Sequence, residues 1–348
     1  TDWQDAIFRT ALAHKHSLSV SGRTKTLSYY VGANYLYREG TIIGSDFERY
    51  GLRVNLDGKR NRLKYGVSFS PSYSKSNYVD ADAQYGGDGV IASALMAPPV
   101  FPVYNSDGSY NWDNNGYLRL EENGVGDTQF NETLNPVALA LEIDDIREKL
   151  NILGNVFASY EFIKGLEYKI TAGGDYYSYI RNYYRPSSLP LRGYKYLDAQ
   201  STPQANYYNN NYFHWTLSNQ LSFNRSFGDH TINALLGMET LRNRYEYFTA
   251  SRDGFPSDDP NFRFLDAGDV GTQKNSGAAT EYSMVSYFGK LDYNYHDRYL
   301  VAFTLRRDGS SRLGNNKWGN FPAASVGWRI SNEPFFDVEA ISNLKVRV

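Results

Sequence analysis

The stretch Leu63-Lys-Tyr-Gly-Val-Ser-Phe-Ser-Pro-Ser-Tyr73 alternates large apolar residues with small or polar ones. In an extended chain, successive side chains point to opposite faces of the sheet. One face of this segment therefore carries Leu63, Tyr65, Val67 and Phe69, and the other carries Lys64, Ser68 and Ser70. Alternation with a period of two predicts a strand with one apolar face and one polar face.

The same alternation recurs along the chain, at 166–176, at 213–223 (where Asn219 interrupts the apolar side) and at 324–330. We expect eleven strands, with a twelfth beginning at Lys345; the eleven lie near 14–22, 27–37, 47–57, 62–75, 148–162, 166–185, 207–226, 230–250, 282–295, 298–312 and 322–331. Several are far longer than the ~5–6 residues of an ordinary strand.

The connections between these strands alternate strictly between short and long. The short ones fall at 22–26, 57–61, 163–165, 227–229 and 295–297, and the long ones at 38–46, 76–146, 186–206, 251–281 and 313–321. Every second connection of an up-and-down barrel lies on the same rim, and outer-membrane barrels have short periplasmic turns and long extracellular loops. A soluble β-sandwich has no reason to sort its loops in this way, although it remains the alternative.

We therefore predict an all-β fold, a transmembrane antiparallel up-and-down β-barrel. A tilted strand needs only ~9–11 residues to cross the hydrocarbon, so the long strands should project beyond the membrane on one side. The face with Leu63 and Val67 should meet lipid. The polar face should meet the lumen, with Lys64, Glu167, Lys169, Asp175 and Arg329 as its charged residues.

Composition narrows the function. The chain has 348 residues, with 36 Lys and Arg against 38 Asp and Glu, a net charge of −2. Such a chain lacks the basic footprint of a nucleic-acid-binding protein. The absence of cysteine excludes a disulfide framework, thiolate metal sites and cysteine catalysis.

A search for chemistry finds no zinc-protease, phosphate-loop or nucleophile-elbow motif. We therefore predict no catalytic residues, no cofactor and no metal site, although a glycosidase carboxylate pair stays open on spacing alone. Three residue pairs could each supply two metal ligands: His14 with His16, Asp80 with Asp82, and Asp113 with Asn115. Zinc and calcium sites need more ligands than two, so these pairs do not predict a metal site.

The longest connection, 76–146, is predicted to be an extracellular loop. It holds the candidate substrate- or partner-contacting residues Tyr104, Tyr110, Asn111, Trp112, Asp113, Asn115 and Tyr117. Aromatic rings stack on sugars or peptide side chains, while Asn and Asp bond hydroxyls and amides. The alternative is that these aromatic residues pack the loop onto itself or onto a lipoprotein lid.

Two segments interrupt the β pattern, and a third, within the longest connection, leads back to it. Residues 1–9 predict a short helix, with Thr1 and Gln4 as a capping box and Trp3 one turn before Ile7. Residues 331–343 predict a second short helix, on the short-turn rim. Residues 138–146 are expected to form a short helix or strand that returns the chain to the barrel.

Several longer strings are more specific than periodicity. They are Thr1-Asp-Trp-Gln-Asp5, Leu18-Ser-Val-Ser-Gly22, Glu39-Gly-Thr-Ile-Ile-Gly-Ser-Asp-Phe-Glu-Arg-Tyr50, Tyr287-Phe-Gly-Lys-Leu-Asp-Tyr-Asn-Tyr-His-Asp-Arg-Tyr-Leu300, Arg306-Arg-Asp-Gly-Ser-Ser-Arg312 and Trp318-Gly-Asn-Phe-Pro322. In these strings the chain resembles the SusC/RagA family of TonB-dependent outer-membrane transporters of Bacteroidetes.

The resemblance implies that residues 1–348 form about half of a 22-stranded barrel domain, without the plug domain, the TonB box or the terminal strands. It further implies active import of bulky nutrients, usually oligosaccharides and sometimes peptides. The implied partners are a SusD-like surface lipoprotein and the TonB–ExbB–ExbD complex, the latter reached through the absent N-terminal part. A passive porin, a soluble or surface glycan-binding β-protein and a surface hydrolase remain as alternatives.

Overall fold

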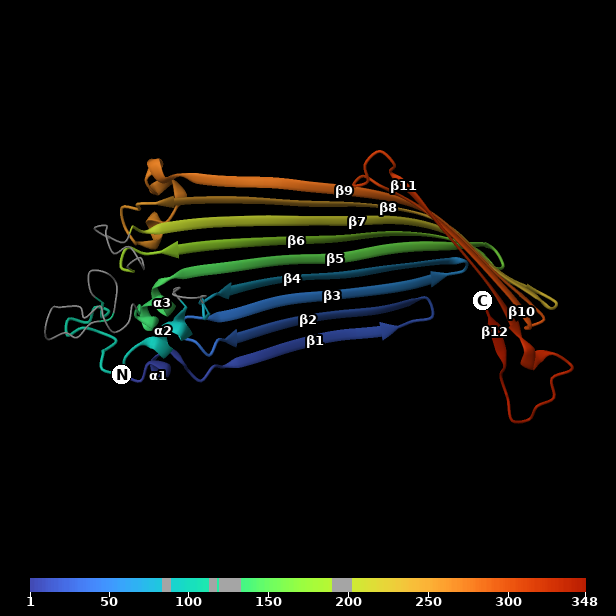
Figure 1. Ribbon diagram of the computed structural model, residues 1–348, viewed down its shortest axis with the longest axis horizontal. Coiled ribbons are helices and arrows are strands. Elements are labelled where there is room, and N and C mark those ends of the chain that lie inside the picture. Colours follow the sequence, from blue (N-terminus) through green and yellow to red (C-terminus); the bar gives the residue numbers. More distant parts are fainter. Residues whose placement is uncertain (83–88, 113–117, 119–132, 190–201) are drawn as a thin grey trace.

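The computed structural model describes residues 1–82, 89–112, 118, 133–189 and 202–348 of the protein. It contains a twelve-stranded sheet in which the strands pair in sequence order, each antiparallel to the next (Figure 1). The strands are β1 Ala13–Arg23, β2 Leu27–Glu39, β3 Asp46–Arg60, β4 Leu63–Asn77, β5 Asp144–Ile163, β6 Leu166–Arg185, β7 Gln204–Phe227, β8 His230–Asp253, β9 Lys274–Tyr295, β10 Tyr299–Ser310, β11 Trp318–Arg329 and β12 Lys345–Arg347. The predicted strands are therefore confirmed, including the twelfth at Lys345.

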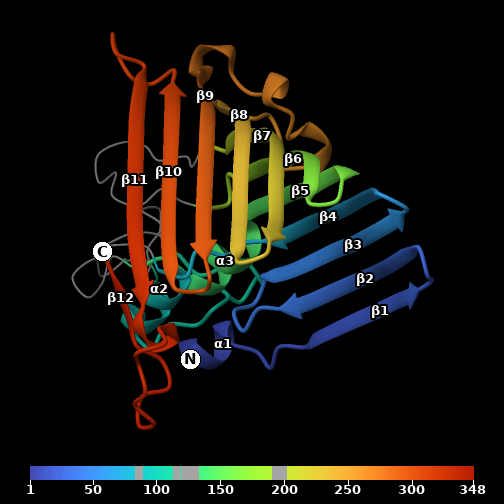
Figure 2. The same cartoon turned by 90° about the vertical axis from the view of Figure 1, so that its right-hand side faces the viewer.

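The sheet curves strongly, so that β9–β11 run at a steep angle to β1–β4, but it does not close on itself (Figure 2). The strands differ in length. β7 and β8 have 24 residues each, whereas β10 and β11 have 12. The long strands β5–β9 consequently reach well past the ends of β10 and β11 (Figure 1).

The short turns gather at one end of the strands and the long connections at the other, as predicted (Figure 1). The short turns need residues that accept positive φ, and Asn61, Gly165, Gly228 and His296 supply them. Gly165 is required for a second reason. A Cβ there would lie 2.4 Å from the carbonyl oxygen of Asn224 on the neighbouring strand.

The strand pairing fixes two faces of the sheet. The register aligns Val67 with Val156 and Ala172 with Leu217, so their side chains share one face, here called the apolar face. Its large residues remain accessible, with Val67 37% and Leu236 64% exposed. Asn219 interrupts this face, and the hydroxyl of Tyr168 donates to its amide oxygen at 2.6 Å. The opposite face, which carries Lys64, is here called the polar face.

The helices partly match expectation. Helix α1, Trp3–Ile7, forms as predicted with Trp3 and Ile7 buried, but Thr1 is not its cap. Asp2 is, because its carboxylate accepts from the backbone N–H groups of Gln4 and Asp5 at 3.0 Å each. A carboxylate is a stronger acceptor than a threonine hydroxyl at the positive end of a helix.

The second predicted helix is wrong. Of residues 331–343, only 331 and 332 belong to a 3-10 turn, η4 Ile330–Asn332. The remainder forms no helix. Pro334 follows two residues after this turn and has no N–H to continue the hydrogen bonding. Two short helices lie in the longest connection, α2 Val90–Met96 and α3 Pro136–Glu142. None of the helices described has the length and apolarity needed to span a membrane.

Candidate functional site

The long-loop end of the sheet carries a compact cap, defined here as α1, α2, α3 and the loop segments packed between them (Figure 1). Its core is a cluster of buried apolar residues drawn from distant parts of the chain: Trp3, Ile7, Val90, Ala94, Ala97, Phe101, Leu118, Leu134, Val137, Ala138, Leu139, Ala140 and Leu189. The indole of Trp3 also donates to the carbonyl of Pro98 at 2.9 Å. The long loop therefore has its own hydrophobic core.

Three of the predicted contact residues form an aromatic stack in this cap. The rings of Tyr104 and Tyr110 lie 5.2 Å apart, and those of Tyr110 and Trp112 lie 5.5 Å apart. Tyr110 and Trp112 pack against the cap core, whereas Tyr104 is 47% exposed. Burial and the nearby Glu142 carboxylate raise the pKa of the Tyr110 phenol. Tyr104 is the member of this stack best placed to meet another molecule.

Asn111 has an internal position. It is fully buried, and its amide donates to the carbonyl of Pro102 at 3.1 Å. The equally buried Asn135 caps α3 and donates to the carbonyl of Val103 at 2.7 Å. Both amides therefore hold the loop together from within, and a contact between Asn111 and a substrate or partner remains a prediction. Asp113, Asn115 and Tyr117 lie outside the described residues.

The predicted lumen-facing charges share the polar face by register. Lys64 pairs with Glu167 across β5 at 2.7 Å, and Lys169 lies 4.7 Å from the ring centre of Phe157. Asp175 lies opposite His214 on β7. Arg329 is at the last residue of β11, where it pairs with Asp297 of a short turn. Their contact with a lumen remains a prediction.

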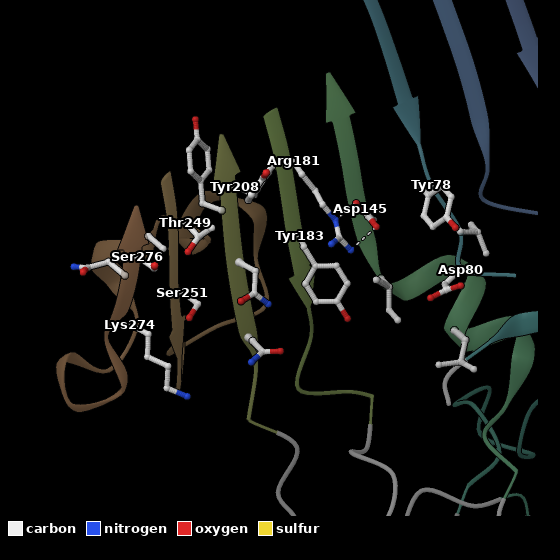
Figure 3. Close-up of a pocket in the computed structure, with 18 of the residues that line it drawn as sticks. Tyr78, Asp80, Asp145, Arg181, Tyr183, Tyr208, Thr249, Ser251, Lys274 and Ser276 are labelled. Atoms are coloured by element: carbon white, nitrogen blue, oxygen red, sulfur yellow. Dashed lines mark hydrogen bonds and ion pairs between the residues drawn. The ribbon is translucent and has the colours of Figure 1, made fainter. Parts of the chain in front are cut away.

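A cavity of about 640 Å³ opens on the polar face where the cap meets the strand ends (Figure 3). Strands β5–β9 form one side and the ends of β4 and α3 the other. Its lining is polar and aromatic: Tyr78, Asp80, Asp145, Arg181, Tyr183, Gln204, Asn206, Tyr207, Tyr208, Thr249, Ser251, Lys274, Asn275 and Ser276, with the apolar Val79, Val90, Leu139, Ile143 and Ala250.

Asp145 organises the charged side of the cavity. Its carboxylate is buried, 5% exposed, and accepts two hydrogen bonds from each of two guanidinium groups. The distances are 3.1 and 2.8 Å from Arg147 and 2.8 and 2.7 Å from Arg181. Two bidentate pairs on one carboxylate hold all three side chains in fixed geometry. They also leave one positive charge in excess.

Aromatic rings complete this arrangement. The Arg147 guanidinium lies 3.4 Å from the ring centre of Tyr78, and that of Arg181 lies 5.2 Å from that of Tyr183. Figure 3 shows Tyr183 in the middle of the lining, between Lys274 on one side and Tyr78 and Asp80 on the other. Fixed cations, tyrosine rings and amide or hydroxyl groups suit a hydrophilic ligand with hydroxyl or acidic substituents.

The sequence reasoning missed this cluster. The predicted strand began at 148, so Asp145 and Arg147 were assigned to the loop. The signal was present, because the polar side of that strand continues backwards through Lys149, Arg147 and Asp145.

The architecture defines the class of protein. Sequentially paired antiparallel strands, an accessible apolar face, a polar face and loops sorted by length are the features of an outer-membrane β-barrel wall. They are not the features of a soluble sandwich, which buries one face of each sheet against another.

Comparison with known proteins finds similar TonB-dependent receptors. The chain is 33% identical to TonB-dependent receptor P3 of Formosa agariphila, and 30% identical to TonB-dependent receptor SusC of Bacteroides thetaiotaomicron, each match covering 100% of this chain. The chain spans about one third of the length of these relatives, 33% and 34%. No family model matches it.

Solved structures agree on the fold. A structure of the RagAB peptide importer in an open-open state superposes with a TM-score of 0.76 at 24% identity, over 99% of this chain and 37% of that one. The ferripyoverdine receptor of Pseudomonas aeruginosa superposes with a TM-score of 0.53 at 12% identity, over 91% and 38%. The chain is similar in sequence to TonB-dependent receptors, SusC among them, and in fold to the RagAB importer, as its sequence strings predicted.

Proposed function

We propose that the chain is part of the wall and the extracellular mouth of an active importer for bulky nutrients, oligosaccharides or peptides. The energy would come from the TonB–ExbB–ExbD complex. The relatives in sequence are named TonB-dependent receptors, and the structural neighbour is titled a peptide importer. These names support the class of transport, and the cavity supports the choice of a hydrophilic ligand.

The observation that carries the proposal is the position and lining of the cavity. It lies on the polar face at the long-loop end, where an incoming solute first meets the wall. Its volume is within the range of ~300–1,000 Å³ that is usual for small-molecule sites. Tyr183 and Tyr208 offer rings, and Lys274 offers a donor. A sugar unit or a short peptide segment matches these groups.

A surface lipoprotein of the SusD type is the proposed partner. The cap presents apolar side chains to solvent on the segment 95–104, where Leu95, Val100 and Tyr104 are all exposed. The β8–β9 connection adds Phe264 and Val270, both largely exposed. Exposed apolar side chains beside a binding cavity are typical of a protein contact surface. Trp112 is partly buried against the cap core, and its contact with a substrate or partner remains a prediction.

The test measures uptake by cells that express the full-length transporter with substituted cavity residues. We expect Tyr183→Ala to reduce uptake several-fold, because one stacked ring contributes ~1 kcal/mol or more. Tyr183→Phe is the matched control and should retain most uptake. Wild-type uptake by Tyr183→Ala combined with Lys274→Gln, at normal expression, would remove the cavity from the transport path.

The energy requirement of uptake distinguishes an active importer from a passive porin. Uptake through an active importer should stop when the proton gradient is collapsed, although binding at the cell surface continues. Uptake that persists unchanged in de-energised cells would show a passive pore with the same barrel wall.

A further inference from the structure

The apolar face of β8–β10 carries a groove of about 710 Å³. The register aligns Leu236, Gly289 and Leu305 across the three strands. Gly289 forms the floor, since it has no side chain, and a Cβ there would lie 3.2 Å from the Leu236 Cδ2 atom. The walls are the exposed side chains of Leu236, Tyr287, Leu291, Phe303 and Leu305.

Arg307 lies at the upper end of this groove, two residues after Leu305 on the same face and opposite Tyr287 in the register. Its guanidinium is 5.0 Å from the ring centre of Trp318, on which Tyr287 also stacks at 6.1 Å. Within the part of the chain that the structure describes, Arg307 forms no ion pair with a carboxylate.

Two other arginines on this face, Arg242 and Arg244, are neutralised. Arg242 pairs with Glu281 at 2.8 Å, and Arg244 pairs with Glu246 at 2.8 Å. These pairs lie higher on β8 and β9, beyond the apolar band. Arg307 therefore combines an unpaired positive charge with an apolar groove directly beneath it.

The depth of Arg307 follows from strand geometry. Tyr299 and Trp328 face each other at the short-turn end of β10 and β11, and Gly309 faces Trp318 at the other end. Ten residue steps at ~3.3 Å, tilted by ~40°, span ~25 Å, the height of the apolar band of such a barrel. Arg307 and Trp318 thus lie at the level of the outer-leaflet headgroups.

We propose that Arg307 and this groove form a binding site for an acylated, phosphate-bearing lipid of the outer leaflet. The phosphate lies against the Arg307 guanidinium beside Tyr287 and Trp318, and one acyl chain runs over Gly289. The bilayer covers this face, so a lipid is the molecule present at the groove. The unpaired cation selects an anionic headgroup over a zwitterionic one.

Arg225 supplies a comparison within the same face. It lies near the short-turn end of β7, with its guanidinium 5.2 Å from the ring centre of Phe227, and it does not line this groove. It is an arginine whose long side chain can reach an interface without a groove beside it. If Arg307 acted only in that way, the two residues would behave alike.

The experiment uses the full-length transporter, delipidated in detergent and titrated with lipid A, with bound lipid counted by native mass spectrometry. We expect Arg307→Gln to weaken binding about five- to tenfold, the effect of one cation near an anionic lipid. Gly289→Leu, which fills the groove and keeps the charge, should weaken it similarly. Arg225→Gln and Arg242→Gln are the matched controls and should stay within about twofold of the wild type.

Two further titrations test whether the bound anion is a lipid headgroup or a soluble phosphate. Zwitterionic phosphatidylcholine should bind more weakly than lipid A, and inorganic phosphate should not compete at equal concentration. Equal lipid A affinity in the wild type and in correctly folded Arg307→Gln would overturn the proposal. So would competition by inorganic phosphate at the lipid's own concentration, which would indicate a soluble-anion site. Neither result depends on nutrient uptake, so the site and the transport function are tested separately.

Discussion

The wall of the sheet and the extracellular cap use apolar side chains in opposite ways. On the wall, Val67 and Leu236 stand on an accessible face. In the cap, Val90 and Ala138 are almost completely enclosed, at 1% and 0% exposure. The same residue types are sorted outward in one region and inward in the other. The difference shows that two solvents act on one chain, lipid around the wall and water around the cap.

The largest expected effect comes from the cap core. Leu139→Ala should destabilise the cap by about 2–5 kcal/mol, because enclosed neighbours cannot collapse into the space left behind. Hydrogen exchange of the amides of α2 and α3 in the full-length protein measures this loss. Leu236→Ala on the wall is the matched change and should cost much less, since lipid chains fill the gap. Equal losses of stability from Leu139→Ala and Leu236→Ala would contradict the conclusion that apolar side chains are enclosed in the cap and accessible on the wall.

The second effect tests the wall by charge. Val67→Arg should cost about 2–4 kcal/mol of folding stability in lipid, the penalty for arginine on the lipid face near mid-membrane. Ser68→Arg, one residue along on the polar face, should cost less. Denaturant titration in lipid vesicles measures both. If Val67→Arg were tolerated and Ser68→Arg were damaging, the two faces would have been assigned the wrong way round.

The smallest effect concerns the ion pair between Lys64 and Glu167 on the polar face, which is partly exposed. Lys64→Met should change stability by less than about 1 kcal/mol, as surface pairs usually contribute little. Two observations would be needed to establish a larger role: a clear loss of stability, and its reduction by high salt, which screens exposed charges.

The sequence predicted the wall almost completely because a strand with different solvents on its two faces repeats every two residues. The twelve strands and the sorted connections follow from that period. Even Asn219, an exception on the apolar side, is accommodated by its bond to Tyr168. Arg307 belongs to the string Arg306–Arg312 used in the sequence analysis. That it has no carboxylate partner among the described residues depends on its neighbours on other strands, which the sequence alone does not give.

The cap could not be predicted in the same way. Its core joins Trp3, Val90, Leu139 and Leu189, which are far apart in the chain. Short helices such as α2, Val90–Met96, have too few turns to show a clear period. The cluster around Asp145 was missed for a related reason: Arg147 and Arg181 meet it only through the pairing of β5 with β6.

Measuring which solvent meets each face is the most direct test of the account. The chain has no cysteine, so single cysteines at Val67, Ser68, Phe69 and Ser70 can carry spin labels in the full-length protein, with any cysteine elsewhere removed. Accessibility to oxygen reports lipid, and accessibility to a water-soluble nickel chelate reports water. We predict that labels at 67 and 69 meet oxygen and those at 68 and 70 meet the chelate. Four labels with the same accessibility would contradict the assignment of lipid and water to opposite faces.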